Sequence, residues 1–350
     1  MTGIAWQALV DLRRLADWMD RQGLGSGPIE HPRRLTGGTQ NLLLHLVRDG
    51  REYVLRRPPQ HPRQDGSRTI AREARVLAAL ADTSVPHAAL IAACDDPSVL
   101  GAGFYLMEPV AGFNASAGMP ALHANDPRMR QRMGFAMVDA LLKLGEVDYR
   151  QVGLEGFGKP EGFLQRQVQR WLSQLEGYHD YQGWPGTQSL PDVGVIAKWL
   201  EQRCPAQFSP GILHGDYHLN NVMFSLHNAE IAAIVDWELA TIGDPLLDLG
   251  WLLVTWPGAD GRGAGTIHVQ PWEGFATVQA LIEHYRHATT RNLDDLTWYI
   301  VLAGFKLGIL LEGSYARACA GKSPMDTALT HHASALRLFE QARVRMAGEP

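Results

Sequence analysis

Apolar residues recur at helical spacing over eight stretches of the chain, and most of these stretches lie after residue 128. In the first stretch, Leu9, Leu12, Ala16 and Met19 share one face, and Gly23 follows as a stop signal. The pattern predicts helices over residues 4–22, 70–80, 129–144, 163–175, 193–203, 275–287, 296–312 and 325–346. The later part of the chain is therefore expected to be mainly helical.

Short apolar runs bounded by turn residues predict strands in the first third of the chain. Residues 42–47 and 52–57 flank Asp49-Gly50, a strong two-residue hairpin signal. A strand at 33–35 precedes them, which gives three antiparallel strands, and residues 104–112 end this part. Two brief strands are expected later, at 212–213 and 231–235.

The composition is that of a globular protein with ample core: 45% of the 350 residues are apolar and 20% are charged. The length fits one two-lobed domain or two domains. The net charge of −5 gives no reason to expect a nucleic-acid surface. Three widely spaced cysteines argue against disulfides and zinc. The N-terminus lacks a signal pattern and no uncharged run is long enough to span a membrane, so a cytoplasmic protein without a membrane partner is expected.

The stretch from Ile212 to Trp251 carries the candidate chemistry. Asp216 and Asp236 each follow a predicted strand, where a loop can present side chains, and Asn221 lies five residues after Asp216. A metal–phosphate site needs hard oxygen ligands such as carboxylates and an amide oxygen. Transfer to a hydroxyl also needs a carboxylate that takes its proton.

The pattern His214-Gly215-Asp216-x-x-x-x-Asn221, followed by Ile234-Val235-Asp236, resembles the aminoglycoside phosphotransferase family, a branch of the protein-kinase-like fold. The resemblance implies an α+β, two-lobe fold with ATP and Mg²⁺ as cofactors. It implies a small antiparallel-sheet lobe at 1–108, a hinge at 109–112 and a mainly helical lobe at 113–350. By the same resemblance Asp216 is the catalytic base, and Asn221 and Asp236 hold the metal.

The resemblance also implies where the nucleotide binds. The turn with Gly37, Gly38 and Thr39 lies where backbone amides approach phosphates. The hinge is expected to read adenine through the carbonyl of Glu108 and the N–H of Val110. Pro109 between them cannot donate, which this pattern permits.

The third strand departs from the usual kinase pattern. It ends in Arg56, where kinases of this fold carry a lysine that bridges the phosphates and a helix glutamate. Strand alternation places Val54, expected under the adenine, on the same face as Arg56. Glu73 is the expected partner of Arg56. Arginine keeps the charge and can bind phosphate through two donors.

The sequence also suggests roles for four neighbouring residues. His214 is expected to be structural, with its ring bonded to backbone near Asp236, and His218 could reach substrate. Glu238 could face metal or substrate. Asp248 is expected to be buried and to brace the catalytic loop by accepting backbone N–H bonds.

The runs at 53–59, 215–221 and 237–249 look closest to kinase-like domains that also occur fused to acyl-CoA dehydrogenases, whose relatives phosphorylate hydroxyacyl-CoA. The expected function is ATP-dependent transfer of a phosphoryl group to a small-molecule hydroxyl. The alternatives are a nucleotide-binding pseudokinase and a true aminoglycoside phosphotransferase. Scattered acidic residues near the late helices favour a neutral or anionic acceptor over a polycation. The sequence leaves open the acceptor, ATP against GTP, and the oligomeric state.

Overall fold

The computed structural model describes residues 6–35, 41–60 and 65–348. The chain forms two compact units. Unit 1 comprises residues 1–112, 150–154 and 232–240, and unit 2 comprises 113–149, 155–231 and 241–350. The sequence analysis assigned 113–350 to one lobe, whereas the structure groups two short segments of that range with unit 1.

Unit 1 is built on a five-stranded antiparallel sheet with the strand order β1-β2-β3-β5-β4. The strands are β1 (Glu30–Arg34), β2 (Leu42–Arg48), β3 (Arg51–Arg57), β4 (Leu90–Cys94) and β5 (Phe104–Met107). The hairpin between β2 and β3 turns at Asp49 and Gly50, both with positive φ. This is the backbone that the Asp-Gly signal predicts.

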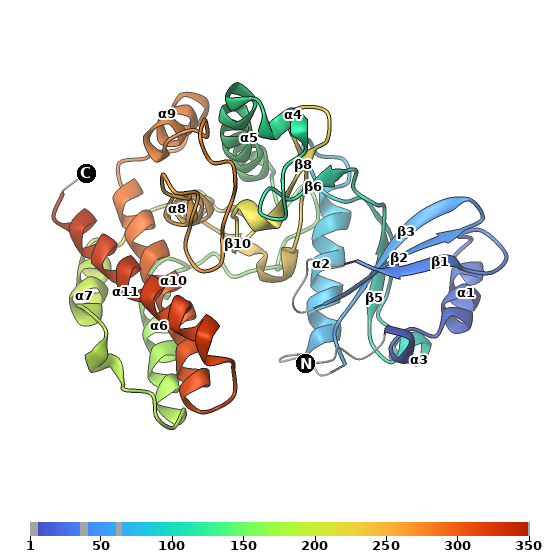
Figure 1. The fold of residues 1–350 in the computed structure, drawn as a ribbon, viewed down its shortest axis with the longest axis horizontal. Helices are drawn as coiled ribbons and strands as arrows, with labels where there is room; N and C mark the ends of the chain where they lie inside the picture. Colours follow the sequence, from blue (N-terminus) through green and yellow to red (C-terminus); the bar gives the residue numbers. More distant parts are fainter. Residues whose placement is uncertain (1–5, 36–40, 61–64, 349–350) are drawn as a thin grey trace. The chain divides into compact units, whose positions relative to one another are not determined.

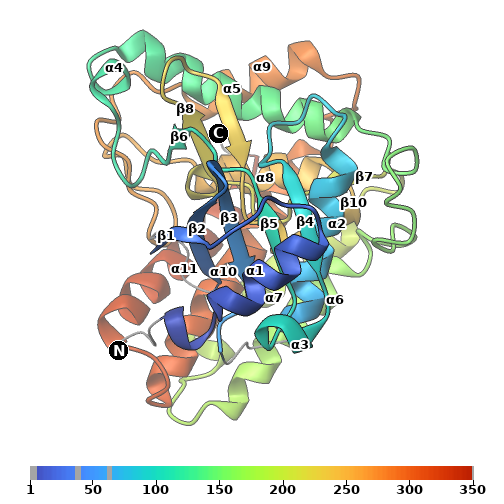
Figure 2. The same cartoon turned by 90° about the vertical axis from the view of Figure 1, so that its right-hand side faces the viewer.

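The two faces of this sheet pack against different helices, and Figures 1 and 2 show α1 on the side opposite α2. Leu44 and Leu55 join Leu15 and Met19 of α1 (Leu12–Arg21) in one core. The opposite face of β3 packs against α2 (Gly66–Leu80). Unit 1 also contains η1 (Trp6–Ala8), α3 (Pro97–Leu100) and η5 (Trp237–Leu239). Strand alternation therefore directs alternate β3 side chains to α1 and to α2.

Unit 2 is mainly helical, and its central element is α10 (Leu296–Cys319), which packs against α6, α7, α8 and α11. Figure 1 shows α10 and α11 side by side. The helices are α4 (Ala121–Ala124), α5 (Pro127–Glu146), α6 (Gln167–Glu176), α7 (Val193–Gln202), α8 (Leu246–Thr255), α9 (Val278–Ala288) and α11 (Met325–Met346), with short 3₁₀ turns η2 (Gly177–Asp180), η3 (Thr187–Ser189) and η4 (Leu219–Asn221). Helix α10 is long and apolar enough to cross a membrane, but 72% of its most apolar window is buried, as in a core helix.

Short strands position the loops of unit 2. Strand β7 (Gly211–Leu213) pairs antiparallel with β10 (Thr241–Gly243). Strand β8 (Val222–Ser225) begins immediately after η4. Two further strands, β6 (Gly112–Phe113) and β9 (Ile231–Ile234), lie where the chain passes from one unit to the other.

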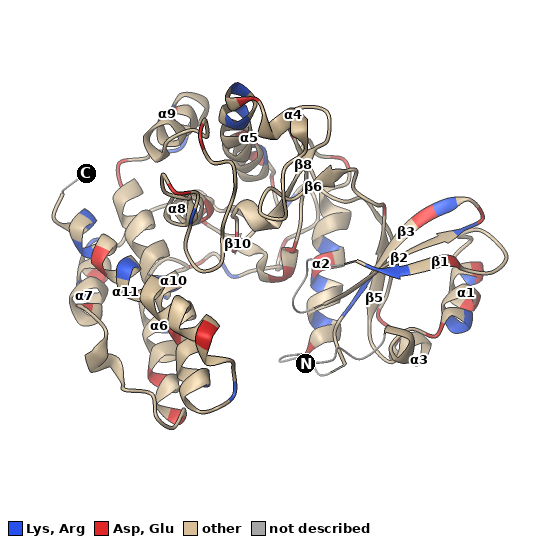
Figure 3. Cartoon of the chain, viewed as in Figure 1, with Lys and Arg blue, Asp and Glu red and all other residues tan. Residues whose placement is uncertain are grey.

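The predicted helices are present, with shifted ends. Helix α2 begins at Gly66 rather than at residue 70, because the Asp65 side chain caps it by accepting from the Arg68 N–H (3.2 Å). Helix α10 continues to Cys319. The sequence analysis missed β4, β8 and β10, which are short, and it treated α4 as loop. Figure 3 shows basic and acidic positions interspersed within each unit, in keeping with the composition.

Candidate active site

The loop from His214 to Asn221 follows β7, and Asp248 holds its backbone. The carboxylate of Asp248 accepts the N–H of His214 (2.6 Å) and the N–H of Gly215 (2.9 Å). Gly215 has φ +88°, a backbone that favours glycine. Asp248 is 2% exposed, and burial raises the pKa of its carboxyl group above the ordinary value. The structural role predicted for Asp248 is confirmed by these two bonds.

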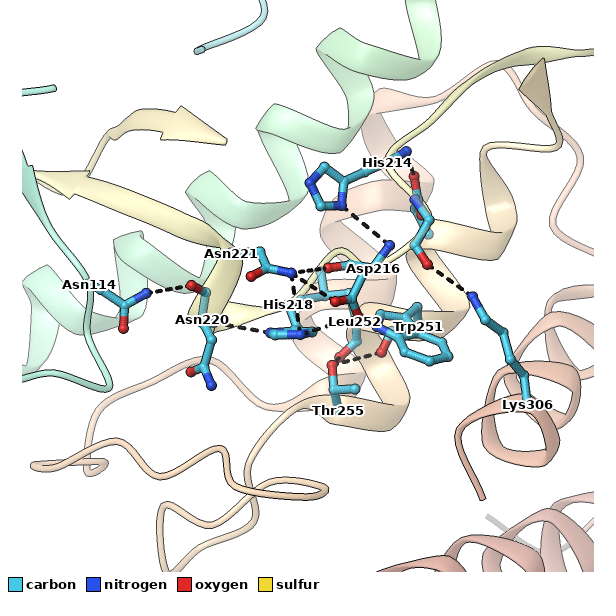
Figure 4. A network of polar contacts seen from close by, with 12 residues as sticks. Asn114, His214, Asp216, His218, Asn220, Asn221, Trp251, Leu252, Thr255 and Lys306 are labelled. Carbon is cyan, nitrogen blue, oxygen red and sulfur yellow. Dashed lines mark hydrogen bonds and ion pairs between the residues drawn. The ribbon is translucent and has the colours of Figure 1, made fainter. Parts of the chain in front are cut away.

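Three side chains fix the carboxylate of Asp216, and Figure 4 shows them converging on it. The indole Nε1 of Trp251 donates to Oδ1 (2.9 Å), and Asn221 Nδ2 donates to Oδ2 (3.0 Å). His218 Nε2 lies 3.2 Å from Oδ1. Burial alone would raise the pKa of Asp216, but the bond from His218 and the nearby positive charges hold it well below the ordinary value. Asp216 is therefore an ionised acceptor held in one orientation.

The bonds around Asp216 also define the state of its neighbours. His218 Nδ1 accepts the N–H of Asn220 (3.2 Å), so in the neutral ring the proton lies on Nε2, facing Asp216. Asn221 Nδ2 also donates to the backbone carbonyl of Asp216 (2.8 Å). With its amide nitrogen directed at Asp216, Asn221 presents its Oδ1 on the other side (Figure 4). An amide oxygen is a ligand that Mg²⁺ accepts.

Two residues outside the predicted set stabilise the loop from distant parts of the chain. Asn114 Nδ2 lies within 3.1 Å of three carbonyl oxygens, those of Leu219, Asn220 and Val222. Lys306 on α10 donates from Nζ to the carbonyl of Gly215 (2.9 Å). His214 Nδ1 accepts the N–H of Asp216 at 3.3 Å, which is a structural role.

The sequence held signals for some of these missed residues. Lys306 is the single charged residue between Leu296 and Leu311, and a lone charge in an apolar helix needs a polar partner. Trp251 stands three residues after Asp248 on α8, so both side chains leave the same helix face. Asn114 had no signal, because its role depends on contacts more than 100 residues away in sequence.

In unit 1, Arg56 lies between two carboxylates. Its Nε is 2.7 Å from Glu73 Oε2, and its Nη2 is 3.1 Å from Glu73 Oε1 and 2.6 Å from Asp236 Oδ1. The Tyr105 hydroxyl donates to Glu73 Oε2 (3.0 Å). The ion pair expected between Arg56 and Glu73 is present, and Asp236 joins it.

The side chains of this cluster differ in their exposure to solvent. The side chains of Arg56 and Glu73 are 9% and 1% exposed, whereas that of Asp236 is 40% exposed. Burial would lower the pKa of Arg56, but the charges of Glu73 and Asp236 outweigh it and hold the pKa above its ordinary value. Asp236 has φ +69°, a left-handed backbone that aspartate tolerates better than most residues.

Carboxylate oxygens of Glu73, Asp236 and Glu238 lie within 4.8 Å of one another. They are hard donors of the kind that suit Mg²⁺. Both oxygens of Glu73 are engaged by Arg56 and Tyr105. Asp236 and Glu238, which are partly exposed, are therefore the members of the group best able to bind a cation.

The remaining predicted nucleotide residues lie in or next to the sheet of unit 1. Val54 is 4% exposed and pairs with Met107 in β5. Glu108 follows β5; its N–H donates to the Ala89 carbonyl (2.9 Å), and its side chain pairs with Arg51 (3.1 Å). Val110 lies two residues further, outside regular structure. Gly37, Gly38 and Thr39 lie outside the described residues, and the binding roles of all these residues stay predictions.

Solved structures and curated relatives both resemble this chain. A Ralstonia eutropha protein provisionally assigned as an aminoglycoside phosphotransferase is 30% identical, with a TM-score of 0.80 over 97% of this chain and 99% of that one. The fold is shared at 14% identity with an APH(4)-Ia variant solved with ADP and hygromycin B (TM-score 0.56, 95% and 98% covered).

The curated relatives are longer proteins. Acyl-CoA dehydrogenase family member 10 of Mus musculus is 30% identical over 83% of this chain and 27% of its own length. Acyl-CoA dehydrogenase family member 11 of Rattus norvegicus is 30% identical over 91% of this chain and 41% of its own length. The chain thus spans less than half of these relatives.

The model of the phosphotransferase enzyme family matches residues 31–281, a range that includes both the Arg56–Glu73–Asp236 cluster and the loop from His214 to Asn221. The protein-kinase-like fold expected from the sequence is confirmed by the structural neighbours. The chain belongs to the phosphotransferase enzyme family.

Proposed function

We propose that this protein transfers the γ-phosphoryl group of ATP to a hydroxyl group of a small molecule, and that a hydroxyacyl-CoA is the first acceptor to test. In this proposal Asp216 orients the acceptor hydroxyl and takes its proton. Asn221, Asp236 and Glu238 are the residues that would hold Mg²⁺, which supplies charge neutralisation on the phosphates when bound. Arg56 positions the phosphates by charge.

The observation that carries the proposal is the way Asp216 is held. Three donors orient one carboxylate, and its pKa is held below the ordinary range, so it is ionised and aimed before any substrate arrives. Preorganised groups of this kind provide much of the catalysis in phosphoryl transfer, where positioning matters more than base strength. A module that only binds nucleotide has no need of this arrangement, which favours the enzyme over the pseudokinase.

The surroundings of Asp216 favour an anionic acceptor. Lys306 Nζ lies 4.1 Å from the ring centroid of Trp251 and 5.5 Å from that of Trp171, and the Arg170 guanidinium lies 5.2 Å from the latter. Lys306 contacts the loop, and the charge of Arg170 acts on Lys306. Positive charge here would repel a polycationic aminoglycoside and attract phosphate or carboxylate groups. The acyl-CoA dehydrogenase family relatives point to the same class of acceptor.

The test is an ADP-release assay with MgATP and a panel of acceptors: 3- and 4-hydroxyacyl-CoA thioesters of several chain lengths, ethanolamine, and kanamycin. Mass spectrometry of the product must show the added phosphoryl group. Asp216→Asn is the inactive control, and Asp294→Asn, an exposed carboxylate of unit 2, is the matched control that should retain activity.

We expect turnover of a hydroxyacyl-CoA, no useful turnover of kanamycin, and no antibiotic resistance on overexpression. Kanamycin turnover with a micromolar KM would contradict the proposed anionic acceptor and favour a true aminoglycoside phosphotransferase. Tight MgATP binding without transfer to any hydroxyl acceptor, including a wider metabolite mixture, would favour the pseudokinase.

A further inference from the structure

The ammonium group of Lys306 lies in a setting unusual for a lysine. Its Nζ donates to the carbonyl oxygen of Gly215 (2.9 Å), the residue before Asp216, and it lies 4.1 Å from the ring centroid of Trp251. A lysine that only filled space in α10 would direct its ammonium to solvent along its flexible stem. Here the ammonium is directed at the loop instead (Figure 4).

Trp251 connects Lys306 to Asp216 through two contacts. The indole that carries the Lys306 ammonium on its face donates its Nε1–H to Asp216 Oδ1 (2.9 Å). A cation on the ring face draws electron density from the indole and makes the N–H a stronger donor, because linked polar contacts polarise one another. Lys306 therefore acts on Asp216 twice, through the backbone at Gly215 and through the indole of Trp251.

The charged groups around Lys306 come from three other parts of the fold. They are Asp216 in the loop, Asp248 on α8 and Arg170 on α6. Removal from water lowers the pKa of Lys306 to about 8, although Asp216 and Asp248 oppose the change. A small change in pH near this value would alter the charge next to the indole.

We propose that Lys306 and Trp251 form a positioning pair for Asp216, and that phosphoryl transfer requires the positive charge on Lys306. This inference rests on the proposed function, since it concerns how the same loop is kept in its reactive arrangement. Loss of the proton leaves an amine that can still donate to Gly215 but no longer polarises the indole. The orientation of Asp216 then weakens while nucleotide binding is unaffected.

The kinetic test measures kcat and KM for MgATP between pH 6 and 10 in the wild-type protein and in Lys306→Arg, Lys306→Met and Trp251→Phe. In the wild type, kcat should fall with rising pH, with a midpoint near 8. Lys306→Arg keeps a permanent charge and should move this fall to higher pH. Lys306→Met should lower kcat by about 10- to 100-fold without that fall, and Trp251→Phe by about tenfold.

Two matched control variants distinguish loss of the Lys306–Trp251 pair from a general loss of stability. Lys322→Met removes an exposed lysine whose Nζ lies 5.2 Å from the Tyr181 ring, and Trp298→Phe removes a buried indole N–H that donates to the Leu200 carbonyl (2.8 Å). Both controls should keep the wild-type pH profile. The KM for MgATP should stay within about twofold in all variants, because the pair acts on the acceptor side.

A second measurement does not depend on activity. In ¹⁵N-labelled protein, the indole N–H resonance of Trp251, assigned by its loss in Trp251→Phe, should titrate with a midpoint near pH 8 and should not titrate in Lys306→Met. If the indole fails to titrate, or if Lys306→Met transfers phosphate like the wild type, the positioning pair is wrong and the proposed function stands. If the indole titrates but no acceptor is phosphorylated, the contact between Lys306 and Trp251 is confirmed. The proposed function then fails, and the role of the pair in phosphoryl transfer fails with it.

Discussion

Two cations, the buried Arg56 in unit 1 and the partly buried Lys306 in unit 2, are held in opposite ways. Arg56 in unit 1 lies between carboxylates at 2.7 Å and 2.6 Å, and its pKa is held above the ordinary value. Lys306 in unit 2 contacts a carbonyl oxygen and an indole face, and its pKa is lowered to about 8. Direct contact with two carboxylates holds the pKa of Arg56 high, whereas removal from water lowers the pKa of Lys306 although the charges of Asp216 and Asp248 oppose the change.

The difference suits the two tasks proposed for these residues. A group that grips phosphate benefits from a charge that never changes, and arginine paired with two carboxylates supplies it. A group that orients one carboxylate needs its charge only in the pH range in which the protein transfers phosphate. Substitutions that remove, keep or exchange these charges can therefore test whether the two residues differ in this way.

The largest effect is expected for Asp216→Asn, which removes the acceptor carboxylate but keeps its shape. The rate of transfer should fall about 10²- to 10⁴-fold, the usual loss for a general base. MgATP affinity, measured by calorimetry, should stay within a few fold. An equal loss of nucleotide binding would make Asp216 a metal ligand rather than the base.

Arg56→Met should have the next largest effect. It leaves Glu73, which is 1% exposed, without its cation, and breaking a buried pair costs about 3–5 kcal/mol. Denaturant unfolding should report this loss, and the Kd for MgATP should rise. Arg56→Lys should have a smaller effect in both measurements, because it keeps the charge and loses only the bidentate geometry of the guanidinium group. Equal behaviour of the two variants would show that charge at this position does not matter.

Asp236→Asn should weaken magnesium-dependent nucleotide binding while sparing most of the stability. The variant removes a partly exposed carboxylate, and Arg56 keeps its contacts with Glu73. We expect the apparent affinity for MgATP to fall about tenfold or more by calorimetry. Unchanged affinity would assign the metal to other ligands, with Glu238 the first to replace.

The smallest expected effect is a change of stability with pH at Lys306. Its pKa is about 8 in the folded protein against about 10.5 in the unfolded chain, so the unfolded chain holds more protons between these values. The free energy of unfolding should therefore rise with pH across this window, by about 1–3 kcal/mol relative to Lys306→Met. Urea unfolding of both proteins at pH 7 and 10 measures the difference, and a constant difference would mean that Lys306 keeps its charge throughout.

The sequence predicted the helices, the hairpin at Asp49-Gly50 and the ends of the strands before Asp216 and Asp236, because each has a local pattern. It also placed Val54 and Arg56 on one face of β3, which follows from strand alternation. The short strand β4 has no such local signature, since it is defined by its pairing with β5.

Site residues were predictable where suitable side chains occur at a characteristic spacing in the sequence. They were not predictable where their roles depend on contacts between distant parts of the chain. Asp216, Asn221 and Asp236 stand out by their order. Asn114 acquires its role only through folding. Trp251 has a helical spacing from Asp248, but this spacing alone does not distinguish its indole from ordinary core. The direction of the Lys306 side chain likewise depends on how α10 packs beside the loop.

The segment Ala232–Ala240 belongs to unit 1 although the chain on both sides of it belongs to unit 2. A truncated protein that stops at Gly112 would retain Arg56 and Glu73 but would lose Asp236, the second carboxylate of that arginine. The same fragment would lose Trp237 and its bond to the Ile234 carbonyl (3.1 Å). Dissection or recombination of this protein at the unit boundary must therefore carry the 232–240 segment along, for instance by fusing it to the end of the fragment through a flexible tether.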